Sequence, residues 1–258
     1  MFIYEELKFK GLKIAHKENK SNAKWKEMRK VIKGILFDLD ETLLNRKKSV
    51  ESFICDQYNR YEPYLEGVEG DTYCSRFIEL DNNGYTWKDR VYERLVEEYQ
   101  LPLSSVELLD DYLLYFKQHC HPFPGMLEML EALKKRNYKL GIITNGRTSF
   151  QLSNIRALGI EAYFDTIVIS EKEGVKKPEK TIFRRALKRI GLEAHEAVFV
   201  GDHLINDIKG AKDVGMKAIW KKRDKETVET GVDYIYSLID LLSIVEEWNA
   251  NRNNTNQH

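Results

Sequence analysis

The sequence contains few cysteines and no long apolar run. Its three cysteines, Cys55, Cys74 and Cys120, are widely spaced and odd in number. This spacing fits neither a zinc site nor a disulfide framework. Scattered thiols are typical of a reducing compartment, so we expect a cytoplasmic protein. No apolar stretch approaches the roughly 20 residues that a membrane helix needs, and we therefore expect no membrane association.

The sequence also lacks an excess of charge of either sign. Lys and Arg together number 41, as do Asp and Glu, and the formal net charge is zero. Proteins that bind nucleic acids usually carry a basic surface, so we expect no nucleic-acid partner. The 258 residues are 42% hydrophobic and 32% charged, which suits a globular chain with one large core and a smaller accessory unit.

The two ends of the chain differ from its middle. Residues 1–30 are rich in lysine and lack the apolar stretch and cleavage site of a signal peptide. We predict a basic N-terminal extension here, which is either solvated, or a partner-binding arm, or the product of a start upstream of Met28. Residues 249–258 are rich in asparagine, and we predict a disordered tail.

Short apolar runs alternate with helical patterns through most of the chain. The runs lie at 31–37, 139–143, 166–169, 197–200 and 216–220, and the first of them is rich in β-branched residues. Amphipathic stretches fill the gaps at 125–137, 148–158, 179–190 and 204–214. This alternation predicts an α/β fold with a Rossmann-like, doubly wound parallel sheet, whose functional sites form at the carboxyl ends of the strands.

Residues 46–121 interrupt the alternation. Their pattern is helical, they are dense in tyrosine, and they contain no convincing parallel strand. We therefore predict a helical domain at 46–121, inserted into an α/β core made of residues 31–45 and 122–248.

Polar side chains follow three of the predicted strands. In chain order they are Asp38, Asp40, Thr144, Asn145, Asp202 and Asp207. If these strand ends are neighbours, four carboxylates converge, and their repulsion is costly unless a cation binds among them. Oxygen ligands favour a hard ion, and Mg²⁺ is the usual ion where phosphate is the substrate.

The spacing of Asp38 and Asp40 is suited to phosphoryl transfer. Residues i and i+2 of an extended segment point the same way, so one carboxylate can attack phosphorus while the other moves protons. Lys177 is the candidate cation that offsets the charge of the nucleophile and the phosphate. The hydroxyl of Thr144 and the backbone amides that follow it, at Asn145 and Gly146, can bind the other phosphoryl oxygens.

Together these motifs resemble the haloacid dehalogenase (HAD) superfamily. Four motifs match in order, namely Asp38-Leu39-Asp40-Glu41-Thr42-Leu43, Thr144-Asn145, Lys177-Pro178 and Gly201-Asp202-His203-Leu204-Ile205-Asn206-Asp207. Each motif alone is weak, because Asp-x-Asp is common by chance. Their order at successive strand ends is specific, and the resemblance covers about residues 31–235.

The resemblance implies a role for each acidic residue. Asp38 would be the nucleophile and a magnesium ligand, and Asp40 the general acid and base, with its backbone carbonyl as another ligand. Asp202 would bind magnesium directly, and Asp207 would support the site through water or through Lys177.

The resemblance also implies how the substrate is held. Thr144 and Lys177 would bind the phosphoryl group. Residues 46–121 would be a helical cap of the C1 type, which closes over the site and contacts the leaving group. Arg147, just after the second motif, and His203, within the fourth, are open between a substrate contact and an ordinary loop position.

The sequence favours a magnesium-dependent phosphohydrolase of a small phosphorylated metabolite, as a monomer or homodimer. A phosphomutase of the β-phosphoglucomutase type shares all four motifs and remains open. A 2-haloacid dehalogenase attacks carbon and lacks the second aspartate of the first motif, so Asp40 disfavours it. A catalytically silent binding protein would not need the intact set. Sugar phosphates, phosphoglycolate and nucleoside monophosphates all remain open as substrates.

Overall fold

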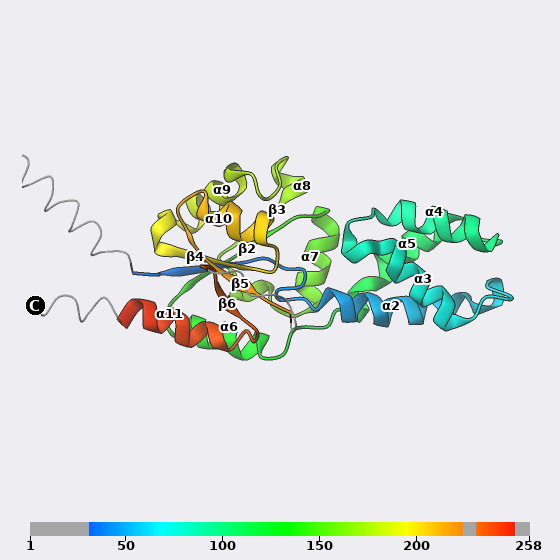
Figure 1. The fold of residues 1–258 in the computed structure, drawn as a ribbon, viewed down its shortest axis with the longest axis horizontal. Coiled ribbons are helices and arrows are strands. Elements are labelled where there is room, and N and C mark those ends of the chain that lie inside the picture. Colours follow the sequence, from blue (N-terminus) through cyan, green and yellow to red (C-terminus); the bar gives the residue numbers. More distant parts are fainter. Residues whose placement is uncertain (1–30, 224–230, 251–258) are drawn as a thin grey trace, which may run out of the picture.

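The chain folds into an α/β unit joined to a bundle of helices (Figure 1). The computed structural model describes residues 31–223 and 231–250. The predicted extension at 1–30 and residues 251–258 of the predicted tail lie outside the described residues. Within the described ranges, no helix has both the length and the apolar character that crossing a bilayer requires.

The α/β unit contains a parallel sheet with the strand order β3-β2-β1-β4-β5-β6. The strands are β1 (Gly34–Phe37), β2 (Lys139–Thr144), β3 (Thr166–Ile169), β4 (Ala197–Gly201), β5 (Lys217–Lys221) and β6 (Asp233–Ile235). The chain builds the sheet outwards from β1 on one side and then from β4 on the other. The predicted doubly wound α/β fold is confirmed, and the point where the winding direction reverses lies between β1 and β4, where such sheets form their sites.

Alternating side chains of the strands enter two hydrophobic cores. Ile35 and Phe37 of β1 pack on one face, whereas Leu36 packs on the other, as the two-residue period of a strand requires. One face is covered by α6 (Met126–Lys135), α7 (Thr148–Ala157) and α11 (Asp240–Ala250). The other is covered mainly by α9 (Lys180–Ile190) and α10 (Gly210–Lys212), with the short α8 (Ser170–Glu173) at the end of β3.

Three details of the α/β unit differ from the prediction. The first strand begins at Gly34 rather than at residue 31. The edge strand β6 was not predicted, because it is only three residues long and two of those residues are exposed. The stretch predicted as one helix at 204–214 is a π-helical turn, η6 (Leu204–Lys209), followed by α10.

The predicted tail starts two residues too early. Asn249 and Ala250 belong to α11. The Asn249 side chain accepts a hydrogen bond from the Ile32 backbone N–H at 2.9 Å and donates to the Ile32 carbonyl at 3.2 Å. This pairing holds the end of α11 against the segment that leads into β1. The asparagine-rich composition therefore gave a wrong first residue for the predicted tail.

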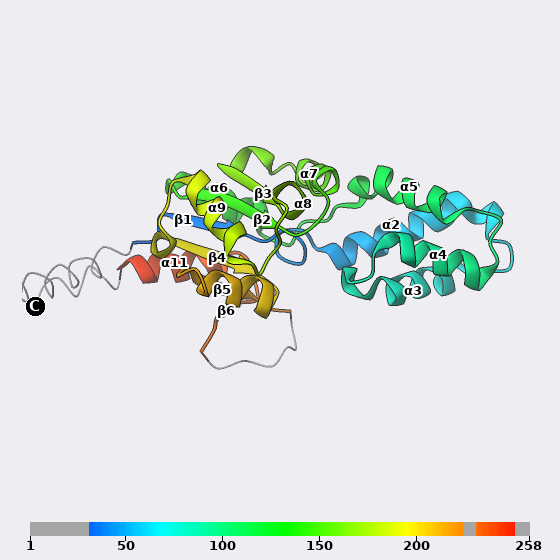
Figure 2. The same cartoon turned by 90° about the horizontal axis from the view of Figure 1, so that it is seen from above.

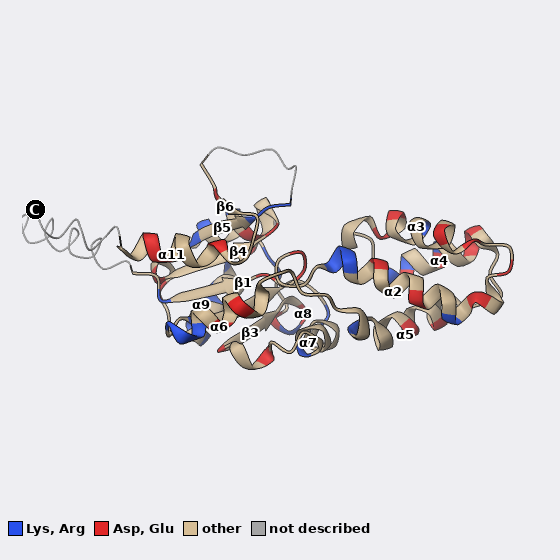
Figure 3. Cartoon of the chain, turned by 90° about the horizontal axis from the view of Figure 1, so that it is seen from below, with Lys and Arg blue, Asp and Glu red and all other residues tan. Residues whose placement is uncertain are grey.

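Residues 46–119 form the second unit, hereafter the helical bundle (Figure 2). Its helices are α2 (Arg46–Tyr61), α3 (Gly70–Asp81), α4 (Lys88–Tyr99) and α5 (Ser105–Tyr115), with the 3₁₀ turns η1 (Glu62–Tyr64), η2 (Asn82–Gly84) and η3 (Phe116–His119). Aromatic rings fill its core, and Phe53, Tyr73, Phe77 and Tyr92 are completely buried. Along its helices, basic and acidic residues are intermixed (Figure 3).

Two adjacent linkers connect the helical bundle to the α/β unit. The Asn45 N–H donates to the His121 carbonyl at 2.8 Å, and the Phe123 N–H donates to the Leu43 carbonyl at 2.9 Å. The chain therefore enters and leaves the helical bundle at one point. Nearby, the ring of Phe150 on α7 stacks on Tyr112 of the bundle, with centroids 5.4 Å apart.

The packing of α9 on the sheet can be tested by truncating one ring. Phe183 is fully buried and meets Phe199 of β4 edge to face, with centroids 5.3 Å apart. We expect Phe183→Ala to lower the free energy of unfolding by about 3–5 kcal/mol, because it removes buried surface and leaves a cavity. Urea denaturation would measure the change. Leu127→Ala on α6, where Leu127 is 45% exposed, is the control and should change stability by no more than about 0.5 kcal/mol.

Candidate active site

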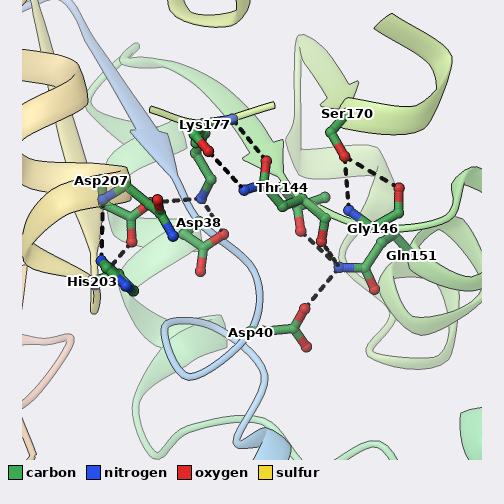
Figure 4. Close-up of polar contacts among 11 residues, drawn as sticks. Asp38, Asp40, Thr144, Gly146, Gln151, Ser170, Lys177, His203 and Asp207 are labelled. Atoms are coloured by element: carbon green, nitrogen blue, oxygen red, sulfur yellow. Dashed lines mark hydrogen bonds and ion pairs between the residues drawn. The ribbon is translucent and has the colours of Figure 1, made fainter. Parts of the chain in front are cut away.

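Most of the predicted site residues meet at the carboxyl ends of the three central strands (Figure 4). Asp38 follows β1 directly, Thr144 is the last residue of β2, and Asp202 follows β4. Asp207 reaches the same place from η6, and Lys177 from the loop between α8 and α9. The segments are far apart in sequence and are brought together by the strand order.

A buried ammonium group joins two of the carboxylates. The Lys177 Nζ donates to Asp38 Oδ1 at 2.5 Å and to Asp207 Oδ1 at 2.7 Å. The side chains of Lys177, Asp38 and Asp207 are 3%, 9% and 1% exposed. Taking charges this far out of water is expensive, so the arrangement depends on these short charge-assisted hydrogen bonds.

The carboxylates remain in excess of the one ammonium group. Burial raises the pKa of Asp38 well above its usual value, and the charges of Asp207, Asp202 and Asp40 act in the same direction, whereas Lys177 opposes them. Burial and the charge of Asp207 likewise raise the pKa of Asp202 to about 7. Even with the Arg223 guanidinium 3.7 Å from Asp202 Oδ2, the carboxylates outnumber the cations at the site.

A divalent cation fits this excess of negative charge. Carboxylate oxygens of Asp38, Asp202 and Asp207 lie within 4.8 Å of one another. All three donors are hard oxygens, which suit Mg²⁺. The Asp40 side chain is not a member of this group and instead points towards Gln151 (Figure 4).

The segment that follows β4 fixes both acidic residues of the fourth motif. The His203 N–H donates to Asp207 Oδ2 at 3.0 Å, and the Trp220 indole donates to the Asp202 carbonyl at 2.8 Å. The His203 imidazole Nδ1 accepts from the N–H groups of Ile205 and Asn206, each at 3.1 Å, and so caps η6. His203 therefore has a structural role as the cap of η6, a role that the sequence alone did not decide.

Gly201 is required by the close approach of Asp207. A Cβ atom at this position would lie 2.4 Å from Asp207 Oδ2. A side chain there would push the carboxylate away from Lys177.

Asn145 and Gly146 are engaged with other parts of the protein. The Asn145 side chain donates to the Lys177 carbonyl at 3.1 Å and accepts from the Lys177 N–H at 2.9 Å. The Gly146 N–H donates to Ser170 Oγ at 2.9 Å. These contacts hold the lysine loop against the end of β2. A substrate-binding role for these two residues stays a prediction.

Gln151 is a polar site residue that the sequence did not identify. Its amide nitrogen donates to Asp40 Oδ2 at 2.8 Å and to Thr144 Oγ1 at 2.7 Å, and its side chain is buried. A glutamine one turn into a helix carries no motif. Its only signal is that a polar residue occupies a buried position of α7.

A cavity of about 140 Å³ separates the end of the sheet from the helical bundle. Asp40, Gln151 and Arg147 line it from the α/β unit, together with Asn145, Gly146 and Phe150. The bundle contributes mainly Arg46, Lys88, Trp87, Tyr112 and Phe116. The Arg147 guanidinium lies 5.8 Å from the centre of the Trp87 ring, so Arg147 contacts the bundle across this cavity.

Two cations on the bundle side share one carboxylate. The Arg46 guanidinium donates to both oxygens of Asp81, at 2.8 and 2.9 Å, and Lys88 pairs with the same group. Burial opposes ionisation of Asp81, but the hydrogen bonds and charges of Arg46 and Lys88 hold its pKa below the usual value. Sequence reasoning missed this cluster, because its members are 35 and 7 residues apart.

The chain is similar to known hydrolases over most of its length. A profile described as haloacid dehalogenase-like hydrolase matches residues 35–221. The glyceraldehyde 3-phosphate phosphatase of Pyrococcus abyssi is 34% identical over 237 residues, which cover 88% of this chain and 99% of that protein.

Solved structures show the same similarity. The HAD phosphatase of Thermococcus onnurineus is 31% identical, with a TM-score of 0.61 over 83% of this chain and 98% of that one. YfnB of Bacillus subtilis, a HAD hydrolase solved bound to magnesium, has a TM-score of 0.68 at 23% identity and covers 83% of this chain and 99% of its own. This second similarity shows the fold.

The raised pKa of Asp202 predicts that the metal-free protein loses folding stability as the pH rises. The folded state binds this proton more tightly than the unfolded state, so its contribution to stability is present below about pH 4 and is lost as the pH rises through about 7. We expect Asp202→Asn to gain stability relative to wild type between pH 4 and 8, by on the order of a few kcal/mol. Urea denaturation in chelator at each pH would measure it, and a pH-independent difference would contradict the assignment.

Proposed function

The chain belongs to the haloacid dehalogenase-like hydrolases and is a phosphatase, and on this premise we propose that it hydrolyses a small phosphate monoester through an aspartyl-phosphate on Asp38, with Mg²⁺ as cofactor. The observation that carries this proposal is the buried Lys177 ammonium, 2.5 Å from Asp38 and 2.7 Å from Asp207. It holds a carboxylate at the end of β1 in one orientation, beside a group of oxygens suited to a metal.

In the first step, a carboxylate oxygen of Asp38 attacks phosphorus. The bond from phosphorus to the ester oxygen breaks, and Asp40 gives a proton to the leaving oxygen. In the second step, Asp40 takes a proton from water, which attacks the phosphorus of the aspartyl-phosphate and releases inorganic phosphate and free Asp38. Asp40 is thus restored to its protonated state at the end of each cycle.

Positive charge and hydrogen-bond donors must surround the phosphoryl group during both steps. Lys177 offsets the charge on Asp38, and the Thr144 hydroxyl donates to a phosphoryl oxygen. Asp38, Asp202 and Asp207 would hold Mg²⁺, with the Asp40 carbonyl added by family resemblance, and the ion would supply positive charge to the phosphoryl oxygens.

A short phosphate ester of the triose-phosphate class is the substrate that we propose. The cavity beyond Asp40 has a volume of about 140 Å³, and its bundle wall carries Arg46 and Lys88, which can bind polar groups of the leaving alcohol. The similarity to a glyceraldehyde 3-phosphate phosphatase supports the same class. In this proposal residues 46–121 act as the cap that closes over the substrate.

The nucleophile is tested by removing one charge. We expect Asp38→Asn to lower kcat/KM for glyceraldehyde 3-phosphate by at least about a thousandfold while circular dichroism shows an intact fold, because an amide cannot attack phosphorus. Asp213→Asn, at a surface residue paired with Lys209, is the control and should retain activity. Substantial turnover by Asp38→Asn would assign the nucleophile elsewhere.

The same assay can separate a hydrolase from a mutase. A panel of phosphate esters with release of inorganic phosphate as the readout should favour three-carbon esters over hexose phosphates and nucleotides. Label retained in a sugar bisphosphate, without phosphate release, would instead indicate a phosphomutase.

Removal of magnesium is a further test. Chelation should lower kcat/KM by about 10²-fold or more, since a metal supplies several kcal/mol of charge stabilisation, and added Mg²⁺ should restore it. Mg²⁺ should also raise the melting temperature of wild type, but not that of Asp202→Asn. Full activity in chelator would contradict the assigned cofactor.

A further inference from the structure

Gln151 lies between two groups that the proposed reaction uses. Its amide nitrogen is 2.8 Å from Asp40 Oδ2 and 2.7 Å from Thr144 Oγ1, and the side chain is 2% exposed (Figure 4). Both contacts come from one –NH₂ group, whose two protons serve these two acceptors. The Asn145 carbonyl, 3.4 Å from the same nitrogen, is a longer contact.

The buried surroundings fix which end of the Gln151 amide faces Asp40. The Asn154 side chain, completely buried one turn further along α7, donates to Gln151 Oε1 at 3.4 Å. Asn154 in turn accepts from the Cys120 thiol at 3.6 Å. With Asp40 ionised, a flipped amide would place its oxygen against the Asp40 carboxylate and its nitrogen against the nitrogen of Asn154, so the observed orientation is the favoured one.

This orientation determines what Thr144 and Asp40 can do. The amide nitrogen can only donate, so the Thr144 oxygen accepts this bond and its own hydrogen stays available to donate elsewhere. Asp40 Oδ2 is likewise an acceptor of the Gln151 bond. The proton that Asp40 transfers is therefore favoured on the other oxygen, Oδ1, to which no hydrogen bond is made within residues 31–223 and 231–250.

The backbone beside the site leaves room for this side chain. Gly146 has a φ of 155°, and a Cβ atom at this position would lie 2.9 Å from Gln151 Cγ. The glycine after the second motif thus allows the glutamine to reach across the end of β2 to Asp40.

We propose that Gln151 is a positioning residue that sets the hydrogen-bond polarity of both Thr144 and Asp40. It holds the acid/base carboxylate with one oxygen directed to the leaving group, and it leaves the Thr144 hydroxyl free to donate to the phosphoryl group. This inference rests on the proposed function, in which Asp40 protonates the leaving oxygen.

The test compares two small esters that differ in their need for a proton. Glycerol 3-phosphate releases an alkoxide that must be protonated, whereas 4-nitrophenyl phosphate releases a phenolate, which can leave without a proton. The measured quantity is kcat/KM with Mg²⁺, because it reports the steps up to cleavage of the ester bond.

We expect Gln151→Met, which retains the length and burial of the side chain, to lower kcat/KM about 30- to 100-fold for glycerol 3-phosphate. For 4-nitrophenyl phosphate the loss should be only about threefold, because the altered polarity of Thr144 affects both esters whereas the misplaced Asp40 affects one. Asn154→Leu, which frees the Gln151 amide to flip, should give a smaller loss with the same preference between the esters.

Two controls separate this role from a merely structural one. Gln57→Met removes a buried amide of the helical bundle, bonded to Asp111 at 2.8 Å, and should change kcat/KM for both esters by the same factor. Equal losses for both esters in Gln151→Met, or no loss, would overturn the inference. Asp40→Asn should show the largest difference between the two esters in the loss of kcat/KM.

The outcomes also distinguish this inference from the function on which it rests. If wild type hydrolyses neither ester with Mg²⁺, or if Asp40→Asn affects both esters equally, the proposed function fails and the inference fails with it. If Asp40→Asn discriminates between the esters and both Gln151→Met and Asn154→Leu do not, only the role of Gln151 is overturned.

Discussion

The ion pairs of Lys177 are the constraint on which the rest of the site depends. One ammonium group, 3% exposed, is shared by a carboxylate from the end of β1 and a carboxylate from η6. Burying these groups without a charged partner would be costly. Several features exist to support this contact: Asn145 fixes the lysine backbone, His203 fixes Asp207, and Gly201 leaves space for the Asp207 carboxylate. The site is therefore organised before any substrate binds.

The groups of the proposed reaction fall into two regions with different surroundings. Asp38, Lys177 and Asp207 lie deep at the strand ends, where low solvent exposure strengthens their electrostatic interactions. Asp40 is only partly buried and faces the cavity that the helical bundle closes. In the proposed reaction, the phosphoryl group is thus bound at the strand ends. The leaving group is contacted at the boundary between the α/β unit and the helical bundle. Among the residues that the structure describes, Gln151 is the one side chain that bonds directly to both Asp40 and the end of β2.

The sequence predicted the fold and the residues at the strand ends for a physical reason. Buried parallel strands need apolar runs, and the polar residues at their ends lie next to those runs, so the positions of Asp38, Thr144 and Asp202 are marked locally. Gln151, Asp81 and the capping role of His203 carry no local mark, because their meaning comes from partners distant in sequence or from backbone geometry. The strand β6 was missed for the opposite reason, since an edge of three residues needs little apolar character.

The paired linkers at Leu43–Asn45 and His121–Phe123 have a consequence for how this chain could be rebuilt. The two points where the backbone leaves and re-enters the α/β unit are directly hydrogen bonded, so a short turn would close the gap. The strand order of the sheet does not involve the residues between them, and the cost of closing a loop grows only slowly with its length. The helical bundle is in this sense a replaceable module: another insertion of very different size could occupy the same junction, provided that it covered the ring of Phe150, which now packs against the bundle.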